Sequence, residues 1–224
     1  MLRGNRYRVH GLELQVPTSV DAEIRYLLLR GRPYEQAEAD LTKSALKPGM
    51  NVLELGGSIG VISAVVRSVI GPVARHVIVE ANADLAEICR LNASRGANDG
   101  AVKVVWGAID YTGNATVSFD LGHNSHTGRV AETGGTAVPA LTASDAAKFL
   151  PNGAIALVCD IEGAEFPMVM HDDALLGRCS VIIMEIHPPY YATQGGSTAS
   201  LVEKLARHGL LLRRQIDDVL LFQR

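Results

Sequence analysis

Two short segments in the last third of the chain place acidic and basic side chains directly after an apolar run. The first reads "AIALVCDIEGAE" and carries Asp160, Glu162 and Glu165, and the second reads "SVIIMEIH" and carries Glu185 and His187. A buried charge is costly unless it is paired, so carboxylates at the ends of such runs predict a functional site. Carboxylates and an imidazole can remove a proton from a substrate, and paired carboxylates can bind a divalent cation.

The catalytic candidates are therefore Asp160, Glu185 and His187, and two interpretations of them stay open. In the first, Asp160 and Glu185 hold a magnesium ion that binds and polarises the hydroxyl groups of an acceptor. In the second no metal takes part, and Asp160 or His187 removes the proton of the acceptor. For Glu162 and Glu165 the alternative is structural, because acidic side chains stabilise the first turn of a helix.

The stretch "VLELGGSIGV", residues 52–61, is typical of a buried strand that turns on glycine into a helix, where nucleotide-like ligands bind. The dinucleotide pattern G-x-G-x-x-G fails whether it is anchored at Gly56 or at Gly57. No Gly-Lys-Ser/Thr follows, which excludes a phosphate-binding loop as well. The turn therefore predicts a ligand without a pyrophosphate group.

The spacing of Glu54, Gly56 and Gly60 fits S-adenosylmethionine, a methyl donor with an ammonium group, a carboxylate and a positive sulfonium. We expect Glu54 to receive the ammonium group, and Gly56, Gly57 and Gly60 to let the backbone approach the ligand without a Cβ atom. Glu80 ends the next apolar run, where a carboxylate can accept hydrogen bonds from both ribose hydroxyls. The alternative for Glu80 is a solvated charge at the end of a strand.

The elements that must position these residues alternate along the chain. Short apolar runs rich in β-branched residues alternate with helical patterns, which predicts an α/β fold with a mostly parallel sheet and helices on both faces. Expected strands lie at 51–55, 76–81, 102–106, 154–161 and 180–186. Expected helices lie at 33–49, 60–70, 83–96 and 196–209, and residues 210–224 are expected to form an antiparallel hairpin.

Neither an internal repeat nor a linker divides the chain, so a single domain over residues 1–224 is expected. Residues 1–32 are interpreted as an N-terminal arm. The polar, glycine-rich stretch 121–136 is interpreted as a long loop over one edge of the sheet, flanked by the strand-like segments "NATVSFD" and "TAVPALTASD". Such loops are often functional, and the alternative is a plain surface excursion. Its His123 and His126 are too isolated to predict a metal site.

Beyond the glycine turn, several segments form a recognisable set. They are "YEQAEADLTKSALKPGMNVLELGGSIGVIS", "VEANADLAEICRLN", "WGAIDYTG", "NSHTGRV", "DIEGAEF" and "MEIHPPY". Together these segments, over roughly residues 34 to 190, resemble the FkbM-type methyltransferases of the Rossmann-like class I S-adenosylmethionine-dependent group. Ala81 stands where such proteins often have proline, and Ser58 stands where many have a second glycine, so the subfamily stays open.

The resemblance implies a Rossmann-like fold with a seven-stranded sheet, and S-adenosylmethionine as the cofactor. It implies that Glu35 caps the amino-acid end of the cofactor and that Ala108 and Ile109 flank the adenine. An exposed helix charge is the alternative for Glu35. The residues expected to contact the cofactor are Glu35, Glu54, Gly56, Gly57, Ser58, Gly60, Glu80, Ala81, Ala108, Ile109 and Asp160.

The resemblance also implies O-methyl transfer to a hydroxyl of a saccharide, or of a glycosylated or polyketide small molecule. A carboxylate and imidazole cluster favours an oxygen acceptor, because amine methylation often needs less help with the proton. Asn124, Ser125, Glu162 and Tyr190 are expected to contact the acceptor. The alternative function is a non-catalytic protein of the same fold that binds S-adenosylmethionine or a nucleotide.

Composition excludes several other classes of partner. The formal charge of −3 gives no general attraction to nucleic acid or to an anionic membrane surface. No apolar run approaches the ~18 residues of a membrane span, and no secretory signal follows the basic start. Three scattered cysteines predict neither disulfides nor structural zinc, so a cytoplasmic protein is expected, and a homodimer is compatible with its size. Cys159 and Trp106 are expected in the core.

Overall fold

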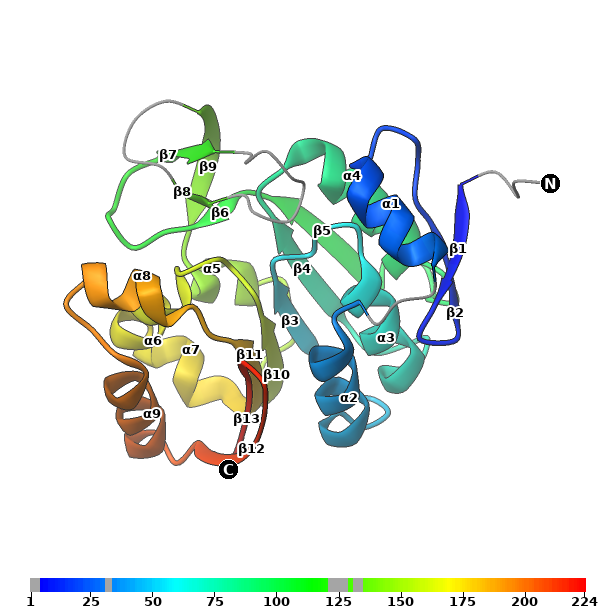
Figure 1. Ribbon diagram of the computed structural model, residues 1–224. Coiled ribbons are helices and arrows are strands. Elements are labelled where there is room, and N and C mark those ends of the chain that lie inside the picture. The colour runs from blue at the N-terminus through cyan, green and yellow to red at the C-terminus, as the bar shows by residue number, and fades with distance from the viewer. Residues whose placement is uncertain (1–4, 31–33, 121–128, 131–134) are drawn as a thin grey trace.

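A seven-stranded sheet forms the centre of the protein in its computed structural model, which describes residues 5–30, 34–120, 129–130 and 135–224 (Figure 1). The strand order is β12-β13-β11-β10-β3-β4-β5. The strands are β3 (Val52–Leu55), β4 (His76–Glu80), β5 (Val102–Trp106), β10 (Ile155–Cys159), β11 (Cys179–Glu185), β12 (Leu211–Ile216) and β13 (Val219–Gln223). Five strands run parallel and β13 pairs antiparallel with β11 and β12, which confirms the predicted mostly parallel sheet and C-terminal hairpin.

The central strands are buried on both faces, as their continuous apolar sequences predict. All residues of β3, β4 and β10 are buried. The order reverses at β3, since the chain proceeds to β4 and β5 on one side and returns through β10 to β11 on the other. The crevice outside the carboxyl ends of strands at such a reversal is the place where open α/β sheets bind ligands.

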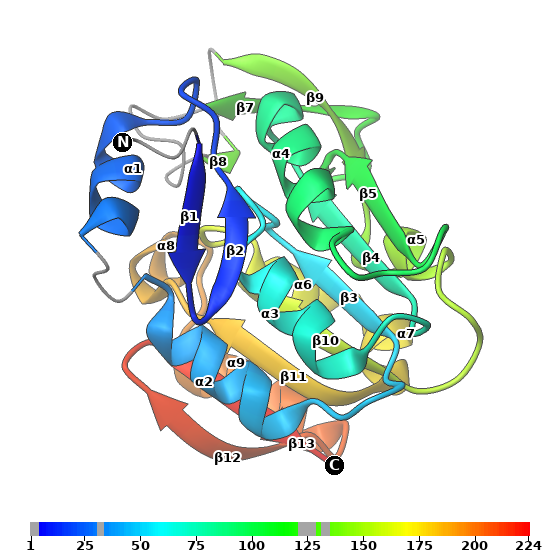
Figure 2. The same ribbon diagram turned by 90° about the vertical axis from the view of Figure 1, so that its right-hand side faces the viewer.

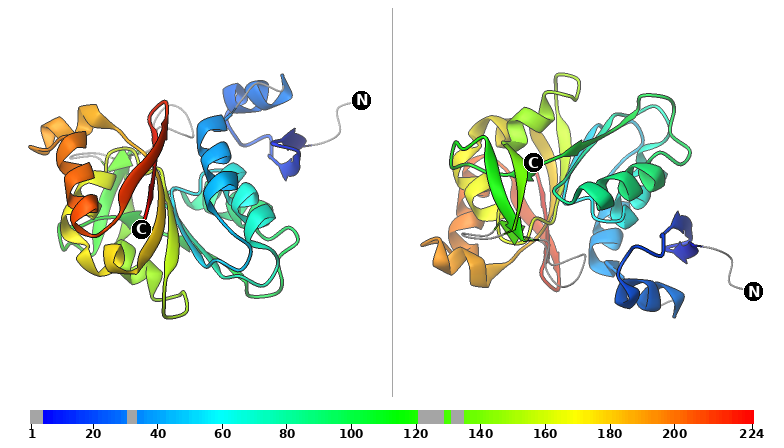
Figure 3. Two further views of the ribbon diagram at one scale, coloured as in Figure 1. Left: turned by 90° about the horizontal axis from the view of Figure 1, so that it is seen from below. Right: turned by 90° about the horizontal axis from the view of Figure 1, so that it is seen from above.

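Helices cover both faces of the sheet (Figure 3). One layer packs on Leu53, Leu55 and Leu157, and it holds α5 (Ala143–Ala147), α6 (Glu165–His171), α7 (Asp173–Arg178), α8 (Pro188–Thr193) and α9 (Thr198–Arg207). The other layer holds α2 (Gln36–Ala45), α3 (Val61–Ile70) and α4 (Ala83–Ala93). The helix expected at 33–49 is shorter than predicted, because Glu35 is left-handed and Leu46 is extended ahead of Pro48.

The N-terminal segment is folded against the second helix layer and is not an extended arm over its described part. Within residues 5–30 it forms the hairpin β1 (Arg6–Val9) and β2 (Leu12–Gln15), followed by α1 (Ala22–Leu29). Leu14 and Ile24 are buried among apolar side chains of α3 and α4. In Figure 2, β2 lies beside α3. The hairpin is therefore anchored by the same apolar burial that holds the helices.

A second, four-stranded sheet lies between β5 and α5 in the chain, and it includes the two strand-like segments expected on either side of the polar stretch. Its order is β6-β9-β7-β8, with β6 (Ala108–Ile109), β7 (Thr116–Asp120), β8 (Arg129–Val130) and β9 (Thr136–Leu141). The loop expected at 121–136 falls mostly outside the described residues. Its described part contributes β8 and the first residue of β9, so this stretch is not a loop throughout.

Trp106 corrects one core prediction, while Cys159 confirms another. Trp106 ends the edge strand β5, where it is 46% exposed, and its indole Nε1 donates a hydrogen bond to the carbonyl of Ala81 at 2.9 Å. An edge position leaves one side of a strand uncovered, which explains the exposure of this large side chain. Cys159 is buried and free. Among the described residues, none of the helices has the length and apolarity needed to cross a membrane.

Candidate active site

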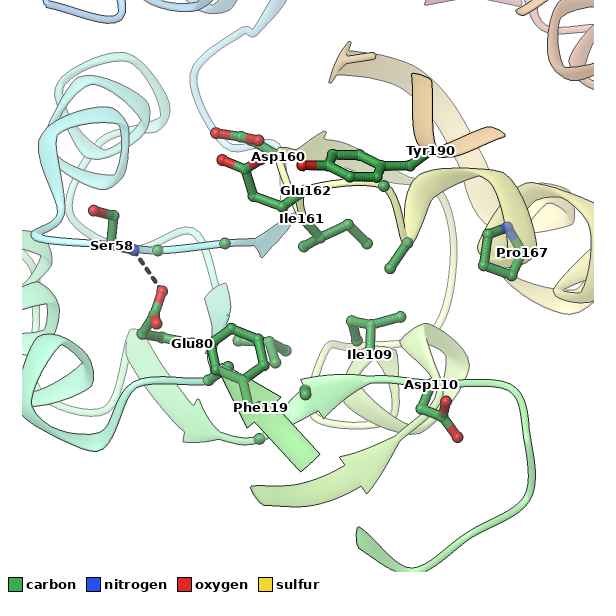
Figure 4. Close-up of a pocket in the computed structure, with 18 of the residues that line it drawn as sticks. Ser58, Glu80, Ile109, Asp110, Phe119, Asp160, Ile161, Glu162, Pro167 and Tyr190 are labelled. Carbon is green, nitrogen blue, oxygen red and sulfur yellow. Dashed lines mark hydrogen bonds between the residues drawn. The ribbon is translucent and has the colours of Figure 1, made fainter. Parts of the chain in front are cut away.

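A cavity of about 880 Å³ opens at the carboxyl ends of β3, β4 and β10 (Figure 4). In Figure 4, Asp160, Glu162 and Tyr190 form one wall, and Glu80, Ile109 and Phe119 lie across from them. The cavity brings together eleven of the residues expected from the sequence. They are Glu35, Gly56, Gly57, Ser58, Glu80, Ala81, Ala108, Ile109, Asp160, Glu162 and Tyr190.

The glycine turn after β3 needs glycine for close packing. Gly56 has φ +87°, and a Cβ atom there would lie 1.7 Å from the carbonyl oxygen of Asp160. A Cβ atom on Gly57 would lie 2.6 Å from Cγ2 of Ile78. Gly60, expected at the cofactor, instead lies outside the cavity lining, and its missing Cβ lets α3 approach the backbone of Cys89. Glycine thus brings β3, β10 and α4 together around the turn.

Glu80 is fixed at the end of β4 by two backbone groups. The Ser58 N–H donates a hydrogen bond to Oε2 and the Asn82 N–H donates one to Oε1, both at 2.7 Å. Burial raises the pKa of Glu80, and these backbone hydrogen bonds act against that shift. Each carboxylate oxygen keeps a further lone pair, so Glu80 can still accept hydrogen bonds from a ligand in the cavity.

Glu54, expected at the ammonium group directly or through water, does not line the cavity. Its carboxylate is 1% exposed, accepts a hydrogen bond from Ser63 Oγ at 2.5 Å and lies 2.8 Å from Nε2 of His76. Side chains alternate across a strand, and at position 54 they face α3. The sequence showed an acidic residue before the glycines but not the direction of its side chain.

Four carboxylates, those of Glu35, Glu38, Asp160 and Glu185, lie close together near Gly56, the first residue of the glycine turn. Single ligand atoms of Glu38, Asp160 and Glu185 all lie within 4.8 Å of one another, and Glu35 lines the cavity nearby. Burial, with the charge of Glu185, raises the pKa of Asp160 to about 8, while His187 opposes that shift. Burial, with the charge of Asp160, likewise raises the pKa of Glu35 to about 8. Glu38 was not predictable from the sequence, because a helix charge in the middle of "EQAEAD" carries no distinguishing signal.

His187 lies behind the cavity wall and does not line it. Its Nε2 lies 3.7 Å from Asp160 and 3.4 Å from Glu162, and its Nδ1 lies 3.2 Å from Glu165. Burial disfavours the charged imidazole, but the hydrogen bond and charge of Glu165, with the other two carboxylates, raise its pKa to about 9. A pKa of about 9 keeps His187 mostly protonated at neutral pH in the free protein.

Glu165 joins the loop after β10 and α8 at one wall of the cavity. Its fully buried carboxylate accepts hydrogen bonds from the backbone N–H groups of Ile161 and Gly163 and, at 3.0 Å, from the hydroxyl of Tyr191. With the contact to His187, this one side chain joins the loop after β10 to α8. The loop is tight, since Glu162 has φ +51° and a Cβ atom on Gly163 would overlap Tyr190.

Phe119 is the main apolar lining residue that the sequence analysis missed. It lies on β7 in the second sheet and faces the cavity across from Ile161 (Figure 4). The strand pattern around it was visible, but a short edge strand gives no sign of which cavity it borders. Asn124 and Ser125, expected at the acceptor, lie outside the described residues, as do His123 and His126.

The mostly parallel sheet, its reversal at β3 and the C-terminal antiparallel hairpin are those of the Rossmann-like methyltransferase fold that the sequence predicted. The chain belongs to the methyltransferase FkbM domain family, whose model matches residues 54–220.

Several solved structures resemble the chain at low identity. A methyltransferase from Pyrococcus furiosus is 12% identical with a TM-score of 0.49, covering 96% of this chain and 89% of that one. A TehB-like SAM-dependent methyltransferase from Corynebacterium glutamicum is 14% identical with a TM-score of 0.47, covering 90% and 94%. Fibrillarin from Aeropyrum pernix, solved with bound S-adenosyl-L-methionine, is 15% identical with a TM-score of 0.47, covering 99% and 82%. No curated protein matches the chain.

Proposed function

We propose that this methyltransferase transfers a methyl group to a hydroxyl of a saccharide, or of a glycosylated or polyketide small molecule. The observation that carries the proposal is the pair of carboxylates, Asp160 and Glu162, on one wall of the cavity with His187 behind them. An alcohol loses its proton as it attacks, so an oxygen acceptor needs such a proton acceptor close by.

The charge of the cavity favours an acceptor without phosphate groups. Of the described lining residues, only His171 carries a basic side chain. Seven are acidic, namely Glu35, Glu38, Glu80, Asp110, Asp120, Asp160 and Glu162. Such a surface repels nucleic acid and sugar phosphates, whereas neutral polyols are tolerated.

The residues present fit the nucleoside part of S-adenosylmethionine. Glu80 is held by two backbone N–H groups with its remaining lone pairs available, which suits the two ribose hydroxyls. Ala81, Ala108, Ile109 and Phe119 offer apolar surface for the adenine. The turn at Gly56, Gly57 and Ser58 brings backbone against the ligand without bulky side chains.

The bound cofactor supplies an electrophilic methyl group on a positive sulfur, so the protein has to orient the acceptor and receive its proton. Asp160 receives the proton in its ionised form, since the positive cofactor lowers its pKa from about 8 in the free protein. Glu162 and Tyr190 orient the acceptor through hydrogen bonds. His187, as an imidazolium, stabilises both carboxylates instead of acting as the base. Magnesium between Asp160 and Glu185 is the competing proposal, and chelation tests it.

Calorimetric titration with S-adenosylmethionine, S-adenosylhomocysteine and NAD tests the cofactor, each with EDTA and with magnesium chloride. Release of S-adenosylhomocysteine is then measured against methyl glycosides, flavonoid glycosides and macrolides, with glucose 6-phosphate as the anionic comparison. We expect micromolar binding of both adenosyl ligands, none of NAD, and turnover with a neutral hydroxyl compound. Binding without turnover on any hydroxyl acceptor would favour the non-catalytic alternative.

Replacing Glu80 by glutamine is expected to weaken S-adenosylhomocysteine and 5′-methylthioadenosine alike, by about 10- to 100-fold, because hydrogen bonds to a charged group are worth about 1.5–3 kcal/mol. Both ligands carry the ribose, so the two losses should match. Calorimetry measures both dissociation constants. Unchanged affinities would remove Glu80 from the ribose site.

Replacing Asp160 by asparagine is expected to lower kcat about 10²- to 10⁴-fold at saturating cofactor, the usual contribution of a general base. The measurement uses the acceptor found in the screen, and the exposed Asp84→Asn on α4 serves as the control. A kcat within twofold of wild type would assign the proton to another group.

A further inference from the structure

We propose that Glu38, Asp160 and Glu185 together receive the α-ammonium group of S-adenosylmethionine. The inference deepens the proposed function, and it rests on the cofactor lying in the cavity with its ribose at Glu80. It assigns a binding role to Glu38 and Glu185 and replaces Glu54, whose carboxylate is engaged with Ser63 and His76.

Glu38 is a buried acid that lacks a partner within the described part of the chain. Its side chain lines the cavity, yet the residue is only 4% exposed. No described residue donates a hydrogen bond to it, and its charged neighbours are the carboxylates of Glu35, Asp160, Glu54 and Glu185. An unpaired buried carboxylate is costly, so its retention next to a ligand cavity indicates a cationic ligand.

Asp160 adds a second unsatisfied acceptor at the same place. Its Oδ1 atom is buried without a hydrogen bond in the described structure, and the nearest cation, His187 Nε2, is 3.7 Å away. Asp160 also belongs to the group with Glu162 and His187 on the acceptor side. Asp160 therefore borders both the ammonium group and the acceptor, and its two carboxylate oxygens can accept hydrogen bonds from them separately.

The spacing of the three acids suits an ammonium group. A primary ammonium has three N–H donors in a tetrahedral arrangement, which places their acceptors about 4.7 Å apart when each N···O distance is about 2.9 Å. One oxygen from each of Glu38, Asp160 and Glu185 lies within 4.8 Å of the others. The three acids come from α2, the end of β10 and the end of β11, so the fold assembles the triangle from separate segments.

A magnesium ion could use the same three oxygens, since carboxylates are its usual ligands. It would, however, leave the ammonium group of the cofactor without its acidic partners, because Glu54 faces α3 in the interior. The ammonium group is therefore the occupant that accounts for both the buried Glu38 and the direction of Glu54.

The test compares S-adenosylhomocysteine with 5′-methylthioadenosine, which keeps the adenosine and the sulfur but lacks the amino-acid end. We expect Glu38→Gln to weaken S-adenosylhomocysteine about 10- to 100-fold and 5′-methylthioadenosine less than twofold, by calorimetry. Glu185→Gln is expected to show the same selectivity, and Glu54→Gln none. Thermal melts establish that each variant is folded at the titration temperature.

Three outcomes would overturn the inference. Glu38→Gln and Glu185→Gln could leave both affinities unchanged, or both could weaken the two ligands equally. Wild-type binding of S-adenosylhomocysteine could also be lost in EDTA and restored by magnesium chloride, which would make the metal the occupant. Failure of the proposed function looks different, since wild-type protein would then bind neither adenosyl ligand, or would bind both and methylate no hydroxyl.

Discussion

Replacing Gly56 by alanine is expected to lower the free energy of unfolding by more than about 4 kcal/mol and to abolish cofactor binding. The new Cβ atom would lie 1.7 Å from the carbonyl oxygen of Asp160, a contact that forces the end of β3 away from β10. The displacement would move Asp160 and the whole glycine turn. Urea denaturation and calorimetry with S-adenosylhomocysteine measure the two effects.

Gly49→Ala is the matched control for this prediction. Gly49 has φ +85°, almost the value of Gly56, but no atom lies within 4 Å of its added Cβ. It should therefore report the backbone strain alone, about 1–2 kcal/mol, with unchanged binding. Equal losses of unfolding free energy in the two variants would mean that the contact between β3 and β10 relaxes without cost. The close packing would then not explain why glycine is needed at position 56.

Cofactor binding is expected to release protons, so the affinity for S-adenosylhomocysteine should rise with pH from about 6 towards 8. The reason is that Asp160 and Glu35, each with a pKa of about 8, hold protons below that pH in the free protein. Contact with an ammonium group favours their ionised forms, so the pKa values fall on binding. A group whose pKa falls on binding strengthens binding as pH rises, by up to about tenfold per pH unit for each proton released.

The rise has an upper limit, because Asp160 and Glu35 are already ionised in the free protein above about pH 8 and no longer release protons on binding. The affinity should therefore level off above pH 8, and it should fall only at the alkaline pH where the α-ammonium group itself loses its proton. 5′-methylthioadenosine has no ammonium group, and its affinity should be flat over the same range. Calorimetry in buffers of different ionisation enthalpy counts the protons directly, and equal heats in all buffers would contradict the prediction.

The free protein offers an independent check on the sign. Asp160 has a folded pKa of about 8, above its ordinary value of 3.8, so the folded state holds more protons than the unfolded state between these values. Its contribution to stability is therefore full below about pH 4 and is lost as pH rises through 8. Urea denaturation without ligand should show unfolding becoming easier over this range.

The strands of the main sheet were predictable from sequence because they are buried on both faces, and short continuous apolar runs such as "AIALVC" are typical of strands in that position. Their ends were less predictable. The run at 154–161 stops as a strand at Cys159, since the chain turns there and places Asp160 at the cavity. The segments of β7 and β9 were expected to be strand-like, but their pairing into a second sheet was not predicted, because short and half-exposed strands give little periodicity.

The residues of the candidate site likewise divide into those that could be predicted from the sequence and those that could not. Glu80 and the glycine turn follow from local spacing, because the strand and turn that carry them are local structures. The roles of Glu38 and Glu54 do not follow from local spacing. The direction in which each side chain points depends on which face of its helix or strand the rest of the fold covers. A buried charge in "EQAEAD" and an interior charge in "VLEL" become distinguishable only after the helices are packed on the sheet.

Glu165 makes a single mechanical unit of the cavity wall that carries Glu162 and Tyr190, where we propose that the acceptor binds. Its buried carboxylate holds the loop after β10, the His187 ring and the first helical turns of α8 at once. A change of acceptor can therefore be engineered more easily by exchanging the side chains of Glu162 and Tyr190 on this frame than by reshaping the frame. In a redesign for a new substrate, Glu165 is the residue to keep fixed while its neighbours are varied.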